Sequence, residues 1–144
     1  MTTTPTPQQT TQQRDRDMTE YLYTALRSLP GEIGGNEAME AALVNQKRAA
    51  EQRRDDAELN AQLSNEIGGK NADERKLNLK AIISKDPEYI AASQEVARYE
   101  AEIELQKAES TGKRREFQAA IALAELHAAR INMIARVQII KEIK

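Results

Sequence analysis

The last two fifths of the chain carry a repeat of seven residues. From Tyr89 onward, apolar or small side chains recur at alternating steps of three and four, which places them on one face of an α-helix. We call this face the seam, and its positions are Tyr89, Ala92, Val96, Tyr99, Ile103, Gln106, Ser110, Lys113, Phe117, Ala120, Ala124, His127, Ile131 and Ile134. Both ends of the seam are apolar and its middle is polar. The pattern predicts one helix over residues 87–143 that must lie against partners, because so long a helix is unstable alone in water.

The alternative for this segment is a turn at Ser110–Thr111–Gly112, which would give two helices, 87–110 and 113–143. A single glycine costs a helix only about 1 kcal/mol relative to alanine, and no proline accompanies it. The continuous helix is therefore favoured.

Shorter elements precede this helix. Residues 1–16 are rich in Thr, Gln and Pro and cannot bury apolar surface, so we expect them to be disordered. The remainder, 17–144, is predicted to form a single helical domain with helices over 18–29, 36–67, 72–84 and 87–143. The first break is placed at Pro30 and the Gly34–Gly35 pair, and the second at Gly68–Gly69. Asn71 with Glu74, and Asp86 with Pro87, are typical starts of the last two helices.

The connection 68–86 reverses the chain, so helices 36–67 and 87–143 are expected to run side by side. The predicted fold is all-α: a long antiparallel helical hairpin or coiled coil with short accessory helices, assembled into an oligomer. If residue 67 faces about 87, Lys47 lies near Lys107 and Glu40 near Arg114.

The composition agrees with this fold class. The 144 residues are 31% charged and only 3% aromatic, as in coiled coils and long-helix proteins. The chain has no cysteine, which excludes a disulfide scaffold and a thiolate metal site. We see no signal peptide and no apolar run of about 18 residues, so a cytoplasmic protein that does not enter membranes is expected.

Candidates for catalysis are few. The only histidine, His127, falls on the seam, where a packed or surface role is more common than a role as a base. No group of residues has metal-ligand spacing, and the "GGK" at Gly68–Lys70 lacks the rest of a phosphate loop. We therefore expect no enzyme activity, no catalytic residues, no metal and no cofactor.

Charge is distributed unevenly along the chain. Residues 1–112 carry a net charge of −6 and residues 113–144 a net charge of +4. In the expected hairpin two basic clusters meet at one height, and we call them together the basic band: Lys47, Arg48, Arg53, Arg54, Lys107, Lys113, Arg114 and Arg115. Such a band can neutralise nucleic-acid phosphates. The alternative is that these bases pair with neighbouring acids, such as Glu51 and Glu104, on a solvated face.

The end of the chain is unusually apolar. Ile131, Met133, Ile134, Val137, Ile139, Ile140 and Ile143 surround much of the helix, so one partner helix cannot cover them all. We expect Ile131, Ile134, Val137 and Ile140 to mediate oligomerisation. The alternative is that the first helix, with Leu22, Leu26 and Leu29, folds over this end.

Two stretches, "QKRAAEQRR" (Gln46 to Arg54) and "LKAIISKDPEY" (Leu79 to Tyr89), make residues 40–120 resemble the phage recombination mediator proteins of the UvsY type. The resemblance implies a homo-oligomer that binds single-stranded DNA in a bacterial or phage-infected cell. A recombinase and single-strand-binding protein would then be further partners. It would assign DNA contact to Lys47, Arg48, Arg53 and Arg54.

Two functions follow from these observations. The first is a non-enzymatic oligomeric accessory protein that binds single-stranded DNA and assists recombinase loading. The second is a structural or adaptor coiled-coil protein that binds only protein partners.

Overall fold

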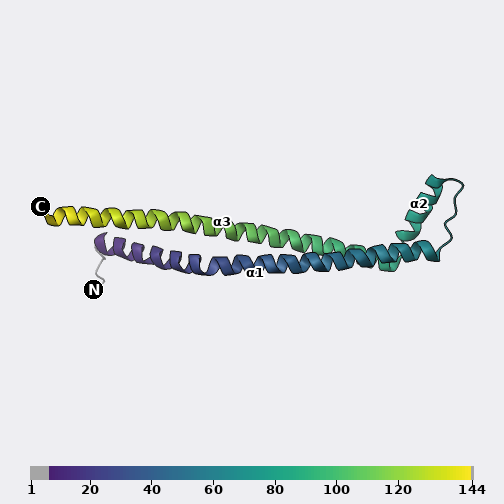
Figure 1. The fold of residues 1–144 in the computed structure, drawn as a ribbon, viewed down its shortest axis with the longest axis horizontal. Coiled ribbons are helices and arrows are strands. Elements are labelled where there is room, and N and C mark those ends of the chain that lie inside the picture. The colour runs from purple at the N-terminus through teal and green to yellow at the C-terminus, as the bar shows by residue number, and fades with distance from the viewer. Residues whose placement is uncertain (1–6, 144) are drawn as a thin grey trace, which may run out of the picture. The chain divides into compact units, whose positions relative to one another are not determined.

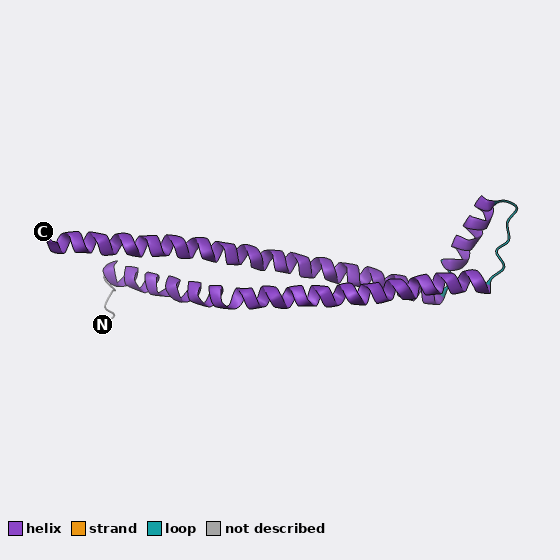
Figure 2. Ribbon diagram, viewed as in Figure 1, coloured by secondary structure: helices purple, strands orange, loops and turns teal. Residues whose placement is uncertain are grey.

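The computed structural model describes residues 7–143, with side chains from residue 10 onward, and this part of the chain is all-α. It contains three helices and no strand within those residues (Figure 2): α1 (Pro7–Ser64), α2 (Ala72–Ile83) and α3 (Pro87–Ile143). Residues 1–6 of the tail predicted to be disordered lie outside the described residues.

Helix α1 replaces two predicted helices. It runs without a break from Pro7 to Ser64, so the expected end near Pro30 and the Gly34–Gly35 pair is wrong. Residues 7–16, expected to be disordered, form its first turns. An internal proline costs a helix about 3 kcal/mol and a glycine about 1 kcal/mol. Packing on both sides of Pro30 offsets this cost, because Leu29 is only 3% exposed and Glu32 forms an ion pair with Lys113 of α3.

The contacts of the chain divide into two units where we predicted a single domain. Unit 1 comprises residues 1–35 and 109–144, and unit 2 comprises residues 36–108. Each unit contains a segment of α1 and a segment of α3, and unit 2 also contains α2.

The core of unit 1 is small and aliphatic. Its buried residues are Leu22, Ala25, Leu29 and Ala120, with Leu26, Phe117 and Ala124 packed against them. Alanines on α3 let the two helices approach closely, which suits a chain with few aromatic side chains. Ion pairs flank the core: Asp15 lies 3.2 Å from Arg130, and Glu32 lies 2.7 Å from Lys113.

Unit 2 also buries small aliphatic side chains, and α2 contributes Ile83 from its last turn. The buried apolar residues are Ala50, Ala57, Ala61, Ile83, Ala92, Val96 and Ile103. Two ion pairs join α1 to α3: Lys47 Nζ lies 3.0 Å from Glu100, and an Arg53 nitrogen lies 2.5 Å from Glu95. The expected register is therefore wrong by one seven-residue repeat. Lys47 pairs with Glu100, which lies seven residues before Lys107 in α3.

The starts of α2 and α3 agree with the sequence. Asn71 Oδ1 accepts a hydrogen bond from the backbone N–H of Glu74 (2.8 Å), and the Glu74 carboxylate accepts one from the N–H of Lys70 (2.8 Å). At α3, Asp86 Oδ1 accepts from the N–H of Tyr89 (2.8 Å). These side chains satisfy backbone donors that a helix start leaves unpaired. Figure 1 shows α2 and its loop connecting the end of α1 to the start of α3.

Helix α3 runs through Gly112 without a break, over the range expected from the sequence. The seam is its covered face as far as His127: Ala92, Val96, Ile103, Ser110 and Ala120 are buried, and the seam positions between them are partly covered. The seam ceases to be covered at Ile131 and Ile134, which are both exposed. Every residue from 128 to 143 is exposed, and we call residues 128–143 the terminal segment.

Candidate functional site

The basic band is divided between the two units. Lys47, Arg48, Arg53, Arg54 and Lys107 belong to unit 2, whereas Lys113, Arg114 and Arg115 belong to unit 1. Within unit 2, Lys47 and Lys107 line one open cavity of about 410 Å³ together with Glu100 and Glu104. The structure thus brings two of the basic residues together, and it places two carboxylates between them.

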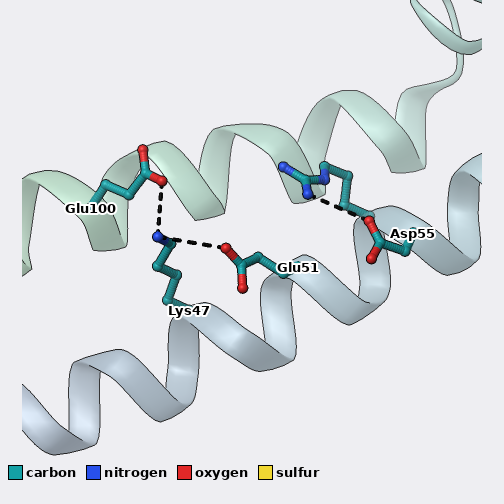
Figure 3. Close-up of polar contacts among 5 residues, drawn as sticks. Lys47, Glu51, Asp55 and Glu100 are labelled. Atoms are coloured by element: carbon teal, nitrogen blue, oxygen red, sulfur yellow. Dashed lines mark hydrogen bonds and ion pairs between the residues drawn. The ribbon is translucent and has the colours of Figure 1, made fainter.

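Lys47 is held by carboxylates from both helices. Its Nζ lies 3.0 Å from Glu100 of α3 and 3.5 Å from Glu51 one turn along α1 (Figure 3). The hydrogen bond to Glu100, with the charges of both carboxylates, raises the pKa of Lys47 above its ordinary value of 10.5. These carboxylates would compete with a phosphate for Lys47.

Most other members of the basic band are paired in the same way. Lys113 is paired with Glu32, and that hydrogen bond raises the pKa of Lys113. The remaining pairs are Arg53 with Glu95, Arg54 with Asp55, and Lys107 with Glu104. Arg114 also has an interaction partner. Pairing with neighbouring acids of the same helix, the alternative that the sequence left open, describes Lys47, Arg54 and Lys107. Arg53 and Lys113 pair instead with acids of the other long helix.

Two arginines differ from the rest. Arg48 in unit 2 and Arg115 in unit 1 are exposed, and neither forms an ion pair within the described part of the chain. They are the members of the basic band best placed to meet an anion from solution.

His127 contacts α1 within unit 1. Its ring nitrogen Nε2 is 2.9 Å from the hydroxyl of Thr19 on α1, and the side chain is half-buried in unit 1. Among residues 10–143, no group of His, Cys, Asp or Glu side chains is arranged to hold a metal ion.

The terminal segment exposes the residues predicted to mediate oligomerisation. Ile131, Ile134, Val137 and Ile140 are 39 to 56% exposed, and Met133, Ile139 and Ile143 are more than half exposed. The alternative, in which the first helix covers this end, is wrong. Leu22, Leu26 and Leu29 belong instead to the cluster around Ala120, which lies nearer the middle of α3.

A groove beside the terminal segment was not anticipated. It has a volume of about 640 Å³ and lies in unit 1 between α1 and α3. Its apolar lining consists of Met18, Tyr21, Leu123 and Leu126, and charged residues of both signs, including Asp17 and Arg130, also line it. A second apolar repeat in α3 that begins at Leu123 would have indicated this groove from the sequence.

No family of known proteins, no curated protein and no solved structure matches the chain. None of the helices described here combines the length and apolar character needed to cross a membrane.

Proposed function

We propose that the protein is a non-enzymatic, oligomeric coiled-coil protein that acts by binding protein. In this proposal α1 and α3 run antiparallel within each unit, and the terminal segment is the association surface. The observation that supports it is the exposure of seven large apolar side chains between Ile131 and Ile143.

The hydrophobic effect favours covering the terminal segment. Apolar surface gains about 25 cal/mol for each Å² that is removed from water. Monomeric soluble proteins rarely leave a contiguous apolar patch larger than a few hundred Å² uncovered, and larger patches mark interaction sites. Within its own chain the terminal segment meets α1 through the pair of Arg130 with Asp15, and its seven large apolar side chains remain 39 to 79% exposed. A partner protein or a second copy of the chain would remove this apolar surface from water.

Sedimentation equilibrium tests this proposal on the full chain and on a chain that ends at Arg130. The shortened chain keeps the whole cluster around Leu29 and Ala120, so its helices are expected to remain, and circular dichroism checks this. We expect an oligomer for the full chain and a monomer for the shortened one. A full chain that remains monomeric at high concentration would refute self-association.

Single-stranded DNA binding, as in a recombination mediator that works with a recombinase and single-strand-binding protein, is the second candidate function. It is supported by the exposed side chains of Arg48 and Arg115 and by the net charge of +4 over residues 113–144. Ion pairing of the other basic residues weakens it, because carboxylates compete with phosphates for the same cations.

Fluorescence anisotropy with a labelled oligonucleotide at low and moderate salt tests this second candidate. DNA binding should weaken steeply with salt. It should also weaken in the Arg48→Ala/Arg115→Ala variant. Lys76→Ala/Lys85→Ala removes the same charge from elsewhere on the surface and is the matched control. No binding at low salt, or equal losses in both variants, would contradict a specific site.

A further inference from the structure

The end of α3 carries a second apolar repeat beside the seam. Its positions follow the same steps of three and four, and we call them the second stripe: Leu123, Leu126, Arg130, Met133, Val137 and Ile140. All six are uncovered, with the five apolar members between 39 and 69% exposed. Steps of three and four are the spacing by which one helix packs along another in a coiled coil.

The second stripe borders the groove of unit 1. Leu123, Leu126 and Arg130 line the groove from α3, and Met18 and Tyr21 line it from α1. The groove and the second stripe therefore share Leu123, Leu126 and Arg130, and together they place exposed apolar side chains from α1 to the terminal segment.

We propose that this surface binds a second copy of the same chain, with the two second stripes packed antiparallel about a two-fold axis between residues 131 and 132. This inference rests on the proposed oligomeric function and assigns its interface and geometry. The product is a four-helix arrangement of two copies of unit 1, each contributing α1 and α3.

The spacing of the second stripe argues for a second copy as the occupant. The steps from Leu123 to Ile140 are three, four, three, four and three, and this series reads the same in both directions. An antiparallel copy therefore meets it without a mismatch: Leu123 faces the other copy's Ile140, and Leu126 faces its Val137. An isologous contact of this kind closes the assembly at two copies.

The chain's own terminal segment cannot occupy its own groove. Helix α3 continues without a break from the groove residues through Ile143, so the terminal segment leads away from them. A second copy brings the same segment back across the groove in the opposite direction. In this register the other copy's Val137 lies over Met18 and Tyr21.

The area agrees with what a stable dimer needs. Seven large apolar side chains of each copy take part, namely Met18, Tyr21, Leu123, Leu126, Met133, Val137 and Ile140. At roughly 90 Å² for each half-exposed side chain they would bury about 600 Å² per copy, and about 1,200 Å² in total reaches the size of specific interfaces.

Charges at the interface are compatible with this pairing. Arg130, the one charged member of the second stripe, lies 3.2 Å from Asp15 of its own chain, which neutralises it.

Single cysteines test the geometry, because the natural chain contains none. Leu126→Cys and Val137→Cys chains, one of them tagged, are mixed at concentrations at which the full chain is dimeric. A short bismaleimide then links cysteines that lie close together. We expect a mixed 126–137 dimer and no linked dimer of either variant alone, because like positions lie about 16 Å apart along the helices.

Ala128→Cys mixed with Ala135→Cys is the matched control. This pair lies at the same height in the proposed register, but on the face of α3 turned away from the second stripe. We expect no linking of the control pair.

The outcomes separate the inference from the proposed function. A dimer in sedimentation without the mixed 126–137 product would overturn the antiparallel interface and leave the oligomer standing. Linking of each variant with itself would show a parallel pairing, which also overturns it. A chain that stays monomeric would overturn both the antiparallel interface and the oligomeric function. The surface would then be expected to bind a different protein.

Discussion

Helix α3 differs sharply between its two parts, although both carry a seven-residue apolar repeat. Between Ala92 and His127 the seam is covered by partner helices, even where it contains the polar residues Gln106, Ser110 and Lys113. Beyond residue 127 the helix is more apolar, and yet every residue from 128 to 143 is exposed. Burial therefore follows the presence of a partner helix and not hydrophobicity alone. The more apolar part is the exposed one, and the proposed oligomer would cover it.

A charge in the second stripe should have the largest effect, and it should act on dimerisation. Leu126→Glu should leave the helix content unchanged and weaken dimerisation by about 100-fold or more, because burying an unpaired carboxylate costs several kcal/mol. Sedimentation equilibrium measures the change. Ala128→Glu adds the same charge two residues away on another face and should leave the dimer intact. Equal dissociation by both variants would contradict the proposed interface.

Truncation in the core of unit 1 should lower stability instead. Leu29→Ala removes a side chain that is 3% exposed and should cost about 3 kcal/mol of unfolding free energy. Denaturant unfolding at fixed protein concentration measures it. Leu105→Ala, at a position that is 70% exposed, is the control and should change stability by less than about 0.5 kcal/mol. A similar loss in both would mean that the cluster around Leu29 does not stabilise the fold.

The polar middle of the seam offers a stabilising change. Ser110 is 4% exposed, and its Oγ has no hydrogen-bond partner among the described residues. Ser110→Ala should raise the unfolding free energy by about 1 kcal/mol, because it removes a buried unsatisfied hydroxyl and improves helix propensity. Thr111→Ala changes the exposed neighbour and controls for propensity. If Ser110→Ala is destabilising, its hydroxyl has a partner.

The smallest expected effect concerns pH. The hydrogen bond to Glu32 raises the pKa of Lys113 above 10.5, so protonated Lys113 favours the folded state. This contribution is fully present below about pH 10.5 and is lost as pH rises through the folded-state pKa. The melting temperature of the natural chain should therefore fall more between about pH 9 and pH 12 than that of Glu32→Gln. Parallel curves would show that the pair contributes nothing.

Much of α3 could be predicted because its signals are local. Asp86 and Pro87 mark its start, and the spacing of the seam identifies the covered face as far as His127. The break expected at Pro30 was wrong because tertiary packing of Leu29 outweighs a local preference. Propensity describes an isolated helix, and α1 is not isolated.

The register of α1 against α3 could not be predicted from the sequence, for a different reason. Shifting one helix by seven residues puts equivalent positions of the repeat opposite each other again, so the apolar pattern cannot distinguish the two alignments. The pairing of Lys47 with Glu100 depends on that shift. The ion pairs between α1 and α3 therefore could not be placed from the sequence, whereas pairs with Glu51 and Glu104 on the same helix were among its alternatives. The groove beside Leu123 was missed as well. Because apolar residues lie all round the terminal segment, the second stripe, which occupies one face of it, does not stand out in the sequence.

The rate of methionine oxidation reports whether a second copy covers the terminal segment. In the single chain Met133 is 62% exposed and Met39 is 54% exposed, so hydrogen peroxide should oxidise them at similar rates, since oxidation follows exposure. If a second copy covers the second stripe, Met133 should react more slowly than Met39 at high protein concentration, and the difference should disappear on dilution. Equal rates at every concentration, with Met133 as reactive as its exposure in one copy implies, would contradict the account.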